Sequence, residues 1–383
     1  MNETETSPIV RTPVLLHPLK VLHVGPGFGQ RGGVASVLGE LAASRRMFEN
    51  QGISFSFFET RGFKKPINFL LFVLFDIPRF FVAMCRKVDI VHFHVSADGS
   101  FYRKFVLYVI ARFGRKRTLF HWHANNLSGF RSNASSIVKR AVTYFIRGAD
   151  GAIGVSGEMS QDLEHERGTR DGIYTIGNSA YVAEQAAKDG KETAGSDCPP
   201  YLAFAARFVP EKGIADLFAA IALLKNEGCF VHLKLAGTGE TRTWDQMIEN
   251  LQIGDRVTFV GWLTGEEKLQ FYREARAFCL PSYREPFGIV TLEAMFCAVA
   301  VIGTNRGGFL DLVEEDVTGY LVAPRDPVAL AARIRSLIES SERARQMGLA
   351  GLDRARRLYS TTAIVDQYVC CYRNVSMKEE RKQ

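Results

Sequence analysis

Two glutamates eight positions apart, Glu285 and Glu293, stand in the stretch EPFGIVTLEAM, which follows the apolar run Ala277–Leu280. Pro286 is typical of a first helical turn, so the stretch is predicted to begin a helix shortly after a strand. At a rise of 1.5 Å per residue, the two glutamates lie about 12 Å apart along that helix. Carboxylates at this separation can hydrogen-bond two sugars of one ligand, which is the span of a nucleotide sugar.

Two cations, Arg207 and Lys212, frame a second loop between a predicted strand and a predicted helix. A guanidinium supplies a bidentate fork and an ammonium a compact charge, so this pair over a helix N-terminus suits a diphosphate. Backbone N–H groups of Phe287, Gly288 and Ile289 are expected to point at the ligand that the first glutamate holds. Each of these groups alone also fits a solvated surface residue, and only their combination indicates a site.

A glycine-rich loop, Gly25–Gly33, follows the first predicted strand and precedes a predicted helix. Glycines let the backbone approach a phosphate closely, and the helix N-terminus offers free N–H groups. Gly27, Gly29 and Gly32 even fit the dinucleotide pattern G-x-G-x-x-G, with Glu59 as the ribose-binding acid. An NAD(P)-dependent oxidoreductase is therefore an alternative. This alternative explains nothing in the second half, and its acid lies 27 residues past the last glycine instead of about 20.

Short β-branched and aromatic runs alternate with helix-length segments along the whole chain. The predicted strands are Lys20–Gly25, Ile53–Glu59, Val88–Val95, Arg117–His123, Gly151–Val155, Ile173–Ile176, Tyr201–Ala206, His232–Ala236, Val257–Gly261, Ala277–Leu280, Val299–Gly303 and Tyr320–Val322. This alternation predicts an α/β fold of two doubly wound, parallel-sheet, Rossmann-like domains. The polar stretch Ala183–Pro200 between them lacks periodicity and is predicted to be a linker. Facing domains of this kind place the carboxyl ends of both sheets at one cleft, where ligands bind.

Several of these motifs occur together in one known family. They are Glu285-x7-Glu293, Arg207-x4-Lys212-Gly213, Gly237-Thr-Gly239-Glu240, Val257-Thr-Phe-Val-Gly261 and the pair Gly32-Gly33. In combination they resemble the family-4 retaining glycosyltransferases of the GT-B fold, from Val21 to about Tyr372. The resemblance implies that Glu285 binds hydroxyls of the transferred sugar and that Glu293 binds the donor ribose. It also implies that the Arg/Lys pair neutralises the leaving diphosphate.

The resemblance implies further roles in the N-terminal half. Gly32 and Gly33 would approach the diphosphate, and His123 matches the family's histidine at the end of the fourth N-terminal strand. His121, two residues earlier, is the competing choice, and a histidine satisfied within the core is the plain alternative. The expected catalytic residues are thus Glu285 and His123. Because cations and N–H groups can stabilise the leaving group in place of a metal, no metal or other cofactor is expected.

Some positions depart from the family's pattern. Phe296, Ala298 and Ala300 stand where the family usually has a small residue, then glycine, and later proline. Asn178-Ser179 stands where the family usually has Asn-Gly, so the glycine of that turn is replaced by serine. The first group concerns helix and strand packing, and none of these changes removes a charged residue of the donor site.

The formal net charge of +7 lies in the N-terminal half, where residues 1–180 hold 23 Lys+Arg against 14 Asp+Glu. Residues 51–130 contain 15 of the 28 phenylalanines. A basic, Phe-rich surface suits an anionic membrane or an anionic lipid-linked ligand better than the alternative of nucleic acid, which we do not expect as a partner. The most hydrophobic stretch, Ile67–Cys85, is interrupted by Asp76, Pro78 and Arg79. A helix pair packed on the protein or lying in the bilayer interface is expected there, not a membrane span.

The seven cysteines form no C-x-x-C pair or metal-type cluster, and the first ten residues do not follow the pattern of a secretion signal. These features favour a reducing compartment and a protein that stays inside the cell.

The motifs together predict a glycosyltransferase that moves a sugar from a nucleotide sugar to a saccharide acceptor, and the resemblance implies that the reaction retains the anomeric configuration. A lipid-diphosphate-linked acceptor and a place on the cytoplasmic face of the inner membrane are expected, in cell-surface polysaccharide synthesis. Residues 1–182 would bind the acceptor and face the membrane, 183–200 would be the linker, and 201–360 would bind the donor. A helix in 361–383 would cross back to the first domain. A non-catalytic nucleotide- or lipid-binding protein of the same fold is the second alternative.

Overall fold

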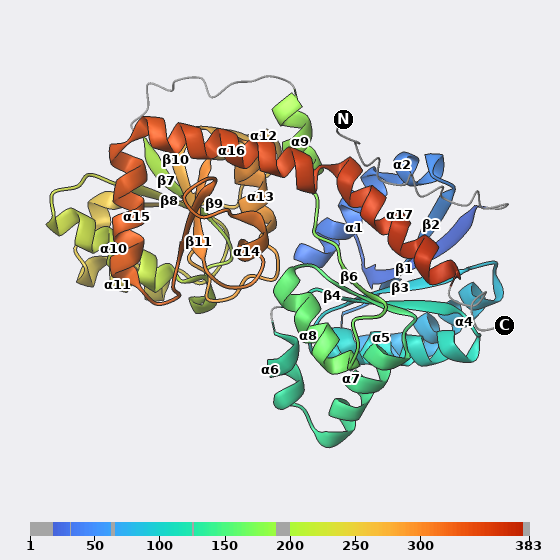
Figure 1. The fold of residues 1–383 in the computed structure, drawn as a ribbon. Helices are drawn as coiled ribbons and strands as arrows, with labels where there is room; N and C mark the ends of the chain where they lie inside the picture. Colours follow the sequence, from blue (N-terminus) through green and yellow to red (C-terminus); the bar gives the residue numbers. More distant parts are fainter. Residues whose placement is uncertain (1–17, 31, 63–65, 125, 189–199, 378–383) are drawn as a thin grey trace, which may run out of the picture.

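The computed structural model describes residues 18–30, 32–62, 66–124, 126–188 and 200–377. It contains two six-stranded parallel sheets, side by side in Figure 1. The first sheet has the order β2-β1-β3-β4-β5-β6. Its strands are β1 (Leu19–Pro26), β2 (Ile53–Thr60), β3 (Ile90–Val95), β4 (Arg117–Trp122), β5 (Gly151–Gly154) and β6 (Ile173–Thr175).

Nine α-helices of the described residues connect or follow the strands of this first unit. They are α1 (Gly33–Ala43), α2 (Arg45–Asn50), α3 (Pro66–Leu71), α4 (Ile77–Cys85), α5 (Gly99–Phe113), α6 (Leu127–Ser132), α7 (Ser136–Gly148), α8 (Gly157–Arg167) and α9 (Tyr181–Lys188). Strand β3 is buried along its whole length, because helices cover both faces of the sheet.

The second sheet has the order β12-β11-β10-β7-β8-β9. Its strands are β7 (Tyr201–Ala205), β8 (His232–Ala236), β9 (Val257–Gly261), β10 (Ala275–Cys279), β11 (Ala300–Thr304) and β12 (Gly319–Val322). Its helices are α10 (Ile214–Asn226), α11 (Arg242–Asn250), α12 (Gly265–Arg273), α13 (Ile289–Phe296), α14 (Phe309–Leu312), α15 (Pro327–Glu339) and α16 (Ser341–Tyr359), with short 3₁₀ turns η2 (Pro210–Lys212) and η3 (Gly254–Arg256). The prediction of two doubly wound α/β domains is thus confirmed.

Each sheet reverses its strand order once. The first sheet grows from β1 to β2 on one side and from β3 outward on the other, so β1 and β3 are neighbours at the reversal. The second sheet repeats this with β7 and β10. Loops at the carboxyl ends of such a strand pair leave the sheet in opposite directions and open a crevice for a ligand. These two reversals are therefore where binding residues are expected.

The stretch predicted to be a linker starts as a helix. Residues 183–188 are the last part of α9, which packs on α12 and α13. The prediction failed there because a short polar segment with buried Ala183 and Glu184 carries too weak a periodicity to indicate a helix. Residues 189–199 lie outside the described residues.

A final helix, α17 (Thr361–Met377), follows α16 after a single residue and returns to the first unit. In Figure 1 these two helices cross from the second unit to the first. The inner side of α17 carries Ile364, Tyr368 and Tyr372, which are buried in one apolar cluster with residues of β1 and α1.

The apolar stretch Ile67–Cys85 is one continuous helical run, which corrects the expected pair of helices. A π-helical turn, η1 (Phe72–Asp76), joins α3 to α4. The wider turn accommodates Pro78, which lacks an N–H and whose ring crowds the preceding turn of an α-helix. Every fourth residue faces the protein, namely Phe72, Asp76, Phe80 and Met84.

Ala298 occupies a left-handed backbone position, with φ of 56°. It stands where the resembled family usually has glycine, and a Cβ atom in this conformation costs about 1–2 kcal/mol. The neighbouring Ala300 lies in β11 with ordinary strand geometry and is fully buried.

Replacing Ala298 with Gly should therefore raise the free energy of unfolding by about 1 kcal/mol, because the strain is relieved. Urea unfolding followed by circular dichroism measures this change. Ala300→Gly is the matched control and should destabilise, because a strand glycine gains no conformational relief. Destabilisation by both variants would contradict the strain at Ala298.

Candidate functional site

The reversal of the second sheet brings Lys212 and Glu285 into contact. Lys212 ends η2 after β7, and Glu285 lies in the loop after β10. The backbone carbonyl of Glu211 ties the two loops together, because it accepts from Tyr283 N at 2.9 Å and from Ser282 Oγ at 3.2 Å. Lys212 Nζ donates to Glu285 Oε2 at 2.5 Å, with both side chains 14% exposed. The two charges neutralise each other at the mouth of the crevice.

Arg207, the second predicted cation, lies on the loop between β7 and η2 and is exposed. Its side chain forms no ion pair with a residue that the structure describes. The helix α10 begins after Gly213, whose left-handed backbone leaves no room for a side chain against the carbonyl of Pro281. Arg207 and Lys212 thus lie near the N-terminus of α10, where its dipole and free N–H groups favour an anion.

Glu293 is held by two residues that sequence reasoning missed. Lys268 Nζ contacts its carboxylate at 2.5 Å, and Tyr272 OH donates to Oε2 at 3.0 Å. Both partners lie on α12, which packs against α13. In the sequence, only the four-residue spacing of Lys268 and Tyr272 could have indicated that they lie on the same helix face. Residue pairs with this spacing occur on most helices, so the spacing does not identify the partners of Glu293.

The N-terminus of α13 differs from the prediction at Pro286. The helix begins at Ile289 with Gly288 as its N-cap, so Pro286 precedes the first turn instead of forming it. Gly288 has φ of 97°, a conformation that turns the chain into the helix. The N–H groups of Gly288 and Ile289 lie at the N-terminus of α13. The first N–H groups of an α-helix have no carbonyl acceptor within the helix. Phe287 is buried against Tyr359, so its side chain supports the loop.

Gly307 and Gly308 pack against the backbone of the loop that carries Glu285 and Phe287. A side chain on Gly307 would collide with the backbone of Glu285, and one on Gly308 with the backbone of Phe287. Gly308 N also donates to the carbonyl of Glu285 at 2.8 Å. The Gly-Gly pair in the sequence was the signal that could have indicated this close approach.

Helix α8 connects the first unit to this loop. Arg284 contacts Glu158 at 2.6 Å and Asp162 at 3.1 Å. Glu158 in turn accepts from Gly307 N at 2.6 Å, and Gly157 N donates to Asp311 Oδ2 at 2.9 Å. These contacts, which sequence reasoning missed, hold the two units together on one side of the cleft.

The glycine loop of the first unit contributes the start of α1. Gly32 is the N-cap with φ of 144°, and Gly33 is the first helical residue. Among the described residues, no hydrogen bond joins Gly32 or Gly33 to the group around Lys212 and Glu293. Glu40 also lies on α1. Burial raises the pKa of its carboxyl, and the charge of Glu293 in the second unit adds to that effect.

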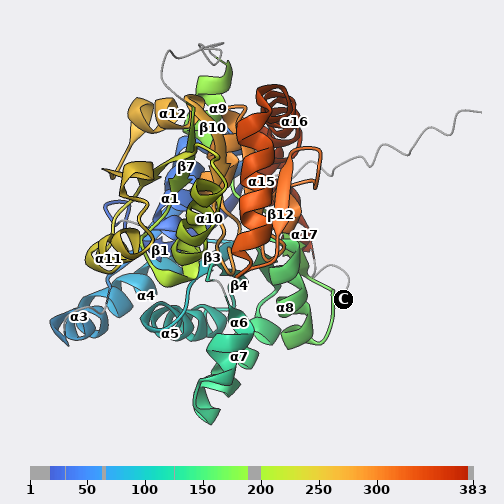
Figure 2. The ribbon, with the colours of Figure 1, turned by 90° about the vertical axis from the view of Figure 1, so that its left-hand side faces the viewer.

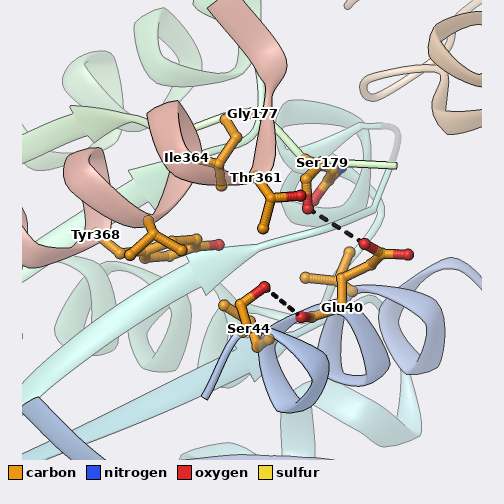
Figure 3. A pocket seen from close by; sticks show the side chains of 11 residues that line it. Glu40, Ser44, Gly177, Ser179, Thr361, Ile364 and Tyr368 are labelled. Atoms are coloured by element: carbon orange, nitrogen blue, oxygen red, sulfur yellow. Dashed lines mark hydrogen bonds between the residues drawn. The ribbon is translucent and has the colours of Figure 1, made fainter. Parts of the chain in front are cut away.

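A small pocket near α1 is lined by Glu40 and by Ser179, which stands where the resembled family usually has a turn glycine. Figure 3 shows Glu40 beside Ser179 and Thr361. Ser179 Oγ donates to Glu40 at 3.4 Å, Tyr181 N donates at 2.7 Å, and the φ of Ser179 is not positive. The turn therefore needs no glycine. The pocket has a volume of about 10 Å³, which holds one water molecule at most and no ligand.

His123 and its competitor His121 belong to one polar chain in the core of the first unit, which we term the histidine ladder. The ladder comprises His123, His94, His23, Tyr372, His92 and His121. The histidines lie on one face of β1, β3 and β4, where alternate residues point toward α17. His123 is only partly buried and follows the end of β4, whereas His121 is fully buried.

Burial keeps these rings neutral. It lowers the pKa of His123 to about 3, with a smaller contribution from the charge of Lys104. Burial likewise lowers the pKa of His23 to about 3, and it holds the pKa values of His92, His94 and His121 well below the usual range.

Two triplets of the ladder could offer nitrogen ligands to a metal ion. Within each triplet the ring nitrogens lie within 4.8 Å of one another, and the triplets are His23/His92/His94 and His94/His121/His123. In the structure these nitrogens are hydrogen-bonded in pairs at 2.9 to 3.1 Å. A bound metal would have to break those bonds. The expectation that transfer needs no metal stays a prediction.

The ladder should make stability dependent on pH. The unfolded chain takes up protons as pH falls below 6.5. In the folded protein, His23 and His123 remain neutral to about pH 3, and the pKa values of the other three rings lie well below their usual value. Each neutral ring therefore lowers the free energy of unfolding by about 1.4 kcal/mol for every pH unit below 6.5. Above pH 6.5 the ring is neutral in both the folded and the unfolded state and has no such effect.

We expect the midpoint of urea unfolding of the first unit to fall steeply between pH 7 and pH 5. The His121→Gln variant removes one titrating ring, so proton uptake on unfolding should decrease by about one proton. Equal midpoints at pH 7 and pH 5 in the unsubstituted protein would contradict the burial of neutral rings.

Comparison with known proteins agrees with the geometry. Residues 187–354 match the family model for glycosyl transferases group 1. The α-maltose-1-phosphate synthase of Mycolicibacterium smegmatis is 31% identical over 277 residues, covering 67% of this chain and 70% of the relative. The glycogen synthase of Mycobacterium tuberculosis is 31% identical over 241 residues, which cover 62% of this chain. The match spans only 57% of the length of that relative.

A solved structure shares the fold. It is HepE of Anabaena in complex with UDP-glucose, with a TM-score of 0.69 and 19% identity, covering 95% of this chain and 100% of that one. The family match does not favour the oxidoreductase alternative. Two facing Rossmann-like sheets, charged loops at the second reversal and the sequence match lead to one assignment: the chain belongs to the group 1 glycosyltransferases of the GT-B fold.

Proposed function

We propose that the protein is a family-4 retaining glycosyltransferase, which moves a sugar from a nucleotide sugar to a saccharide acceptor. The observation that carries the proposal is the contact of Lys212 with Glu285 beside exposed Arg207, near the N-termini of α10 and α13. A diphosphate is the ligand that two cations and two helix N-termini suit together.

In this reaction the bond between the sugar carbon C1 and the diphosphate oxygen breaks, and negative charge grows on the leaving phosphate. Arg207 and Lys212 stabilise that charge, together with N–H groups at the helix N-termini. When Lys212 turns to the phosphate, Glu285 loses its partner and accepts hydrogen bonds from hydroxyls of the transferred sugar. The acceptor hydroxyl attacks from the same face, and its proton passes to the departing phosphate, which retains the anomeric configuration.

Glu293 would bind the ribose of the donor. One of its oxygens already accepts from Tyr272, and Lys268 neutralises the carboxylate. Lys268 is 27% exposed and Glu293 is 19% exposed, so the pair is open enough for ribose hydroxyls to replace the ammonium.

Glu285→Gln should lower the transfer rate at least about 100-fold, because the amide cannot replace the carboxylate at the reacting sugar. The assay is transfer from radiolabelled UDP-, GDP- and ADP-sugars to a membrane extract. Glu211→Gln is the matched control, since Glu211 is an exposed acid in the loop of Lys212.

The control should keep the rate, and both variants should keep the unfolding midpoint. Full activity of Glu285→Gln with an unchanged midpoint would refute the assignment of Glu285.

For the acceptor we propose a lipid-diphosphate-linked saccharide of cell-surface polysaccharide synthesis, met on the cytoplasmic face of the inner membrane. The support is the exposed apolar face of the run from α3 to α4. This face consists of Ile67, Phe69, Leu70, Val73, Leu74, Phe75, Phe81 and Val82. In Figure 2, α3 and α4 lie together at one edge of the first unit beside α5.

The run from Ile67 to Cys85 has a mean hydropathy of 1.9, and by length and composition it could cross a membrane. Its buried stripe argues instead for lying in the bilayer interface. Asp76 is fully buried within 3.8 Å of Arg61 and 3.7 Å of Arg79. A helix that keeps this carboxylate against the protein can offer only its other side to lipid.

Basic side chains lie on the same unit. A shallow groove of about 570 Å³ on α6 and α7 is lined by Arg131, Lys139, Arg140 and Arg147. Such a groove attracts anionic headgroups, which complements the apolar face.

The double variant Phe75→Ser/Phe81→Ser should weaken binding to vesicles at least about tenfold, because two exposed rings no longer enter the bilayer. Flotation with vesicles containing anionic phosphatidylglycerol measures binding, and purely neutral vesicles should bind less. Phe230→Ser is the control, since Phe230 is 61% exposed on the second unit. Equal binding by the double variant and the control would exclude this face as the contact.

A further inference from the structure

The histidine ladder is a continuous polar chain in an apolar core. It uses five of the eight histidines of the protein. At the cleft end, His123 Nε2 pairs with His94 Nδ1 at 3.0 Å, and His94 Nε2 pairs with His23 Nδ1 at 2.9 Å. Both ring nitrogens of His94 are thereby occupied.

The hydroxyl of Tyr372 on α17 continues the chain. It lies 3.4 Å from His23 Nε2 and 2.9 Å from His92 Nδ1. His92 Nε2 then pairs with His121 Nδ1 at 3.1 Å. Both ring nitrogens of His23 and of His92 are therefore occupied as well.

The ladder has two free ends of different character. His121 Nε2 is buried and has no hydrogen-bond partner in the part of the chain that the structure describes. His123 Nδ1 has no partner among the described residues, and His123 is only partly buried at the carboxyl end of β4, the side on which the cleft is expected.

The protons of the ladder can be counted. Five neutral rings and one hydroxyl carry six protons, and the five hydrogen bonds need one each. The sixth proton lies either on one of the two free ends or on the Tyr372 hydroxyl, where it takes part in none of the five bonds. If it is on His123 Nδ1, every ring is protonated at Nδ1. If it is on His121 Nε2, every ring is protonated at Nε2. In both of these arrangements all five rings share one tautomer.

A mixed arrangement is costly. Tyr372 could accept from His23 and His92 at once, but its own proton would then have no acceptor in the buried site. A buried donor without an acceptor destabilises the folded protein. Continuity through the Tyr372 hydroxyl therefore favours the shared tautomer.

We propose that the histidine ladder is a positioning device that makes its five rings adopt one tautomer together, so that the proton at the cleft-facing Nδ1 of His123 is set by the whole ladder. The donor or acceptor role of His123 toward a sugar hydroxyl then depends on Tyr372, on the helix that returns from the second unit. The catalytic consequence rests on the proposed function, whereas the shared tautomer does not.

The test uses the full-length protein labelled with ¹⁵N-histidine. Nitrogen shifts assign the tautomer of each ring, and scalar couplings across N–H···N bonds identify paired rings. We expect one tautomer for all five rings and couplings for the three His–His pairs. Mixed tautomers would overturn the proposal. A bound transition metal, detected by elemental analysis and removal with a chelator, would also overturn it.

Tyr372→Phe removes the link and keeps the ring. Tyr368→Phe is the matched control, because Tyr368 is buried one turn earlier on α17 and its hydroxyl has no hydrogen-bond partner. The ring of Tyr368 nevertheless lies 6.2 Å from that of His121 and 6.0 Å from that of His92. Tyr372→Phe should shift the His123 signals across three hydrogen bonds, whereas Tyr368→Phe should leave them unchanged. Equal effects of the two variants on His123 would refute the coupling.

The transfer assay provides the functional readout. Tyr372→Phe should lower kcat about tenfold, which corresponds to one hydrogen bond, with KM for the donor nearly unchanged. Tyr368→Phe should keep kcat. If the unsubstituted protein transfers no sugar, the proposed function fails while the spectra still decide the ladder. If the unsubstituted protein transfers sugar but kcat of Tyr372→Phe is normal, the catalytic role of the ladder is refuted and the proposed function stands.

Discussion

The parallel pairing of β7 with β10 is the constraint on which the charged site depends. These strands are neighbours in the sheet but lie far apart in the chain, and the segments after them leave in opposite directions. Their carboxyl ends therefore bring Lys212 and Glu285 to one point. The carbonyl of Glu211 and the Gly307–Gly308 turn then hold the loop after β10 in place. These supports act through backbone atoms, and the side chains of Lys212 and Glu285 meet each other at the mouth of the crevice.

Electrostatic pairing makes this site stable before any ligand binds. Lys212 with Glu285 and Lys268 with Glu293 are partly buried ion pairs, and an unpaired charge in either place would be costly to desolvate. Arg207 remains exposed. On the proposed function, a diphosphate and sugar hydroxyls would take the place of one partner in each pair. In the structure the charged groups of this site are thus partners of one another.

The two faces of the first sheet serve different purposes. One face packs under α17 and carries the histidine ladder, while the other packs under helices that include α4 and α5. The buried stripe of the run from α3 to α4 belongs to this second face, and its other side is exposed and apolar. One sheet therefore separates a neutral polar chain that ends at the cleft from a hydrophobic outer surface.

The sequence by itself determined the alternation of strands and helices, because buried parallel strands are unmistakable apolar runs such as Ile90–Val95. It also determined the donor-site candidates, since Glu285, Glu293, Arg207 and Lys212 follow strand ends at short range. Only the tertiary structure decided their partners. The pairing of Glu293 with Lys268, the bridge from Arg284 to Glu158 and the ladder from His123 to Tyr372 join residues that no local pattern relates. Neighbouring parallel strands bring such residues together after long crossovers, and periodicity within one segment carries no information about that pairing.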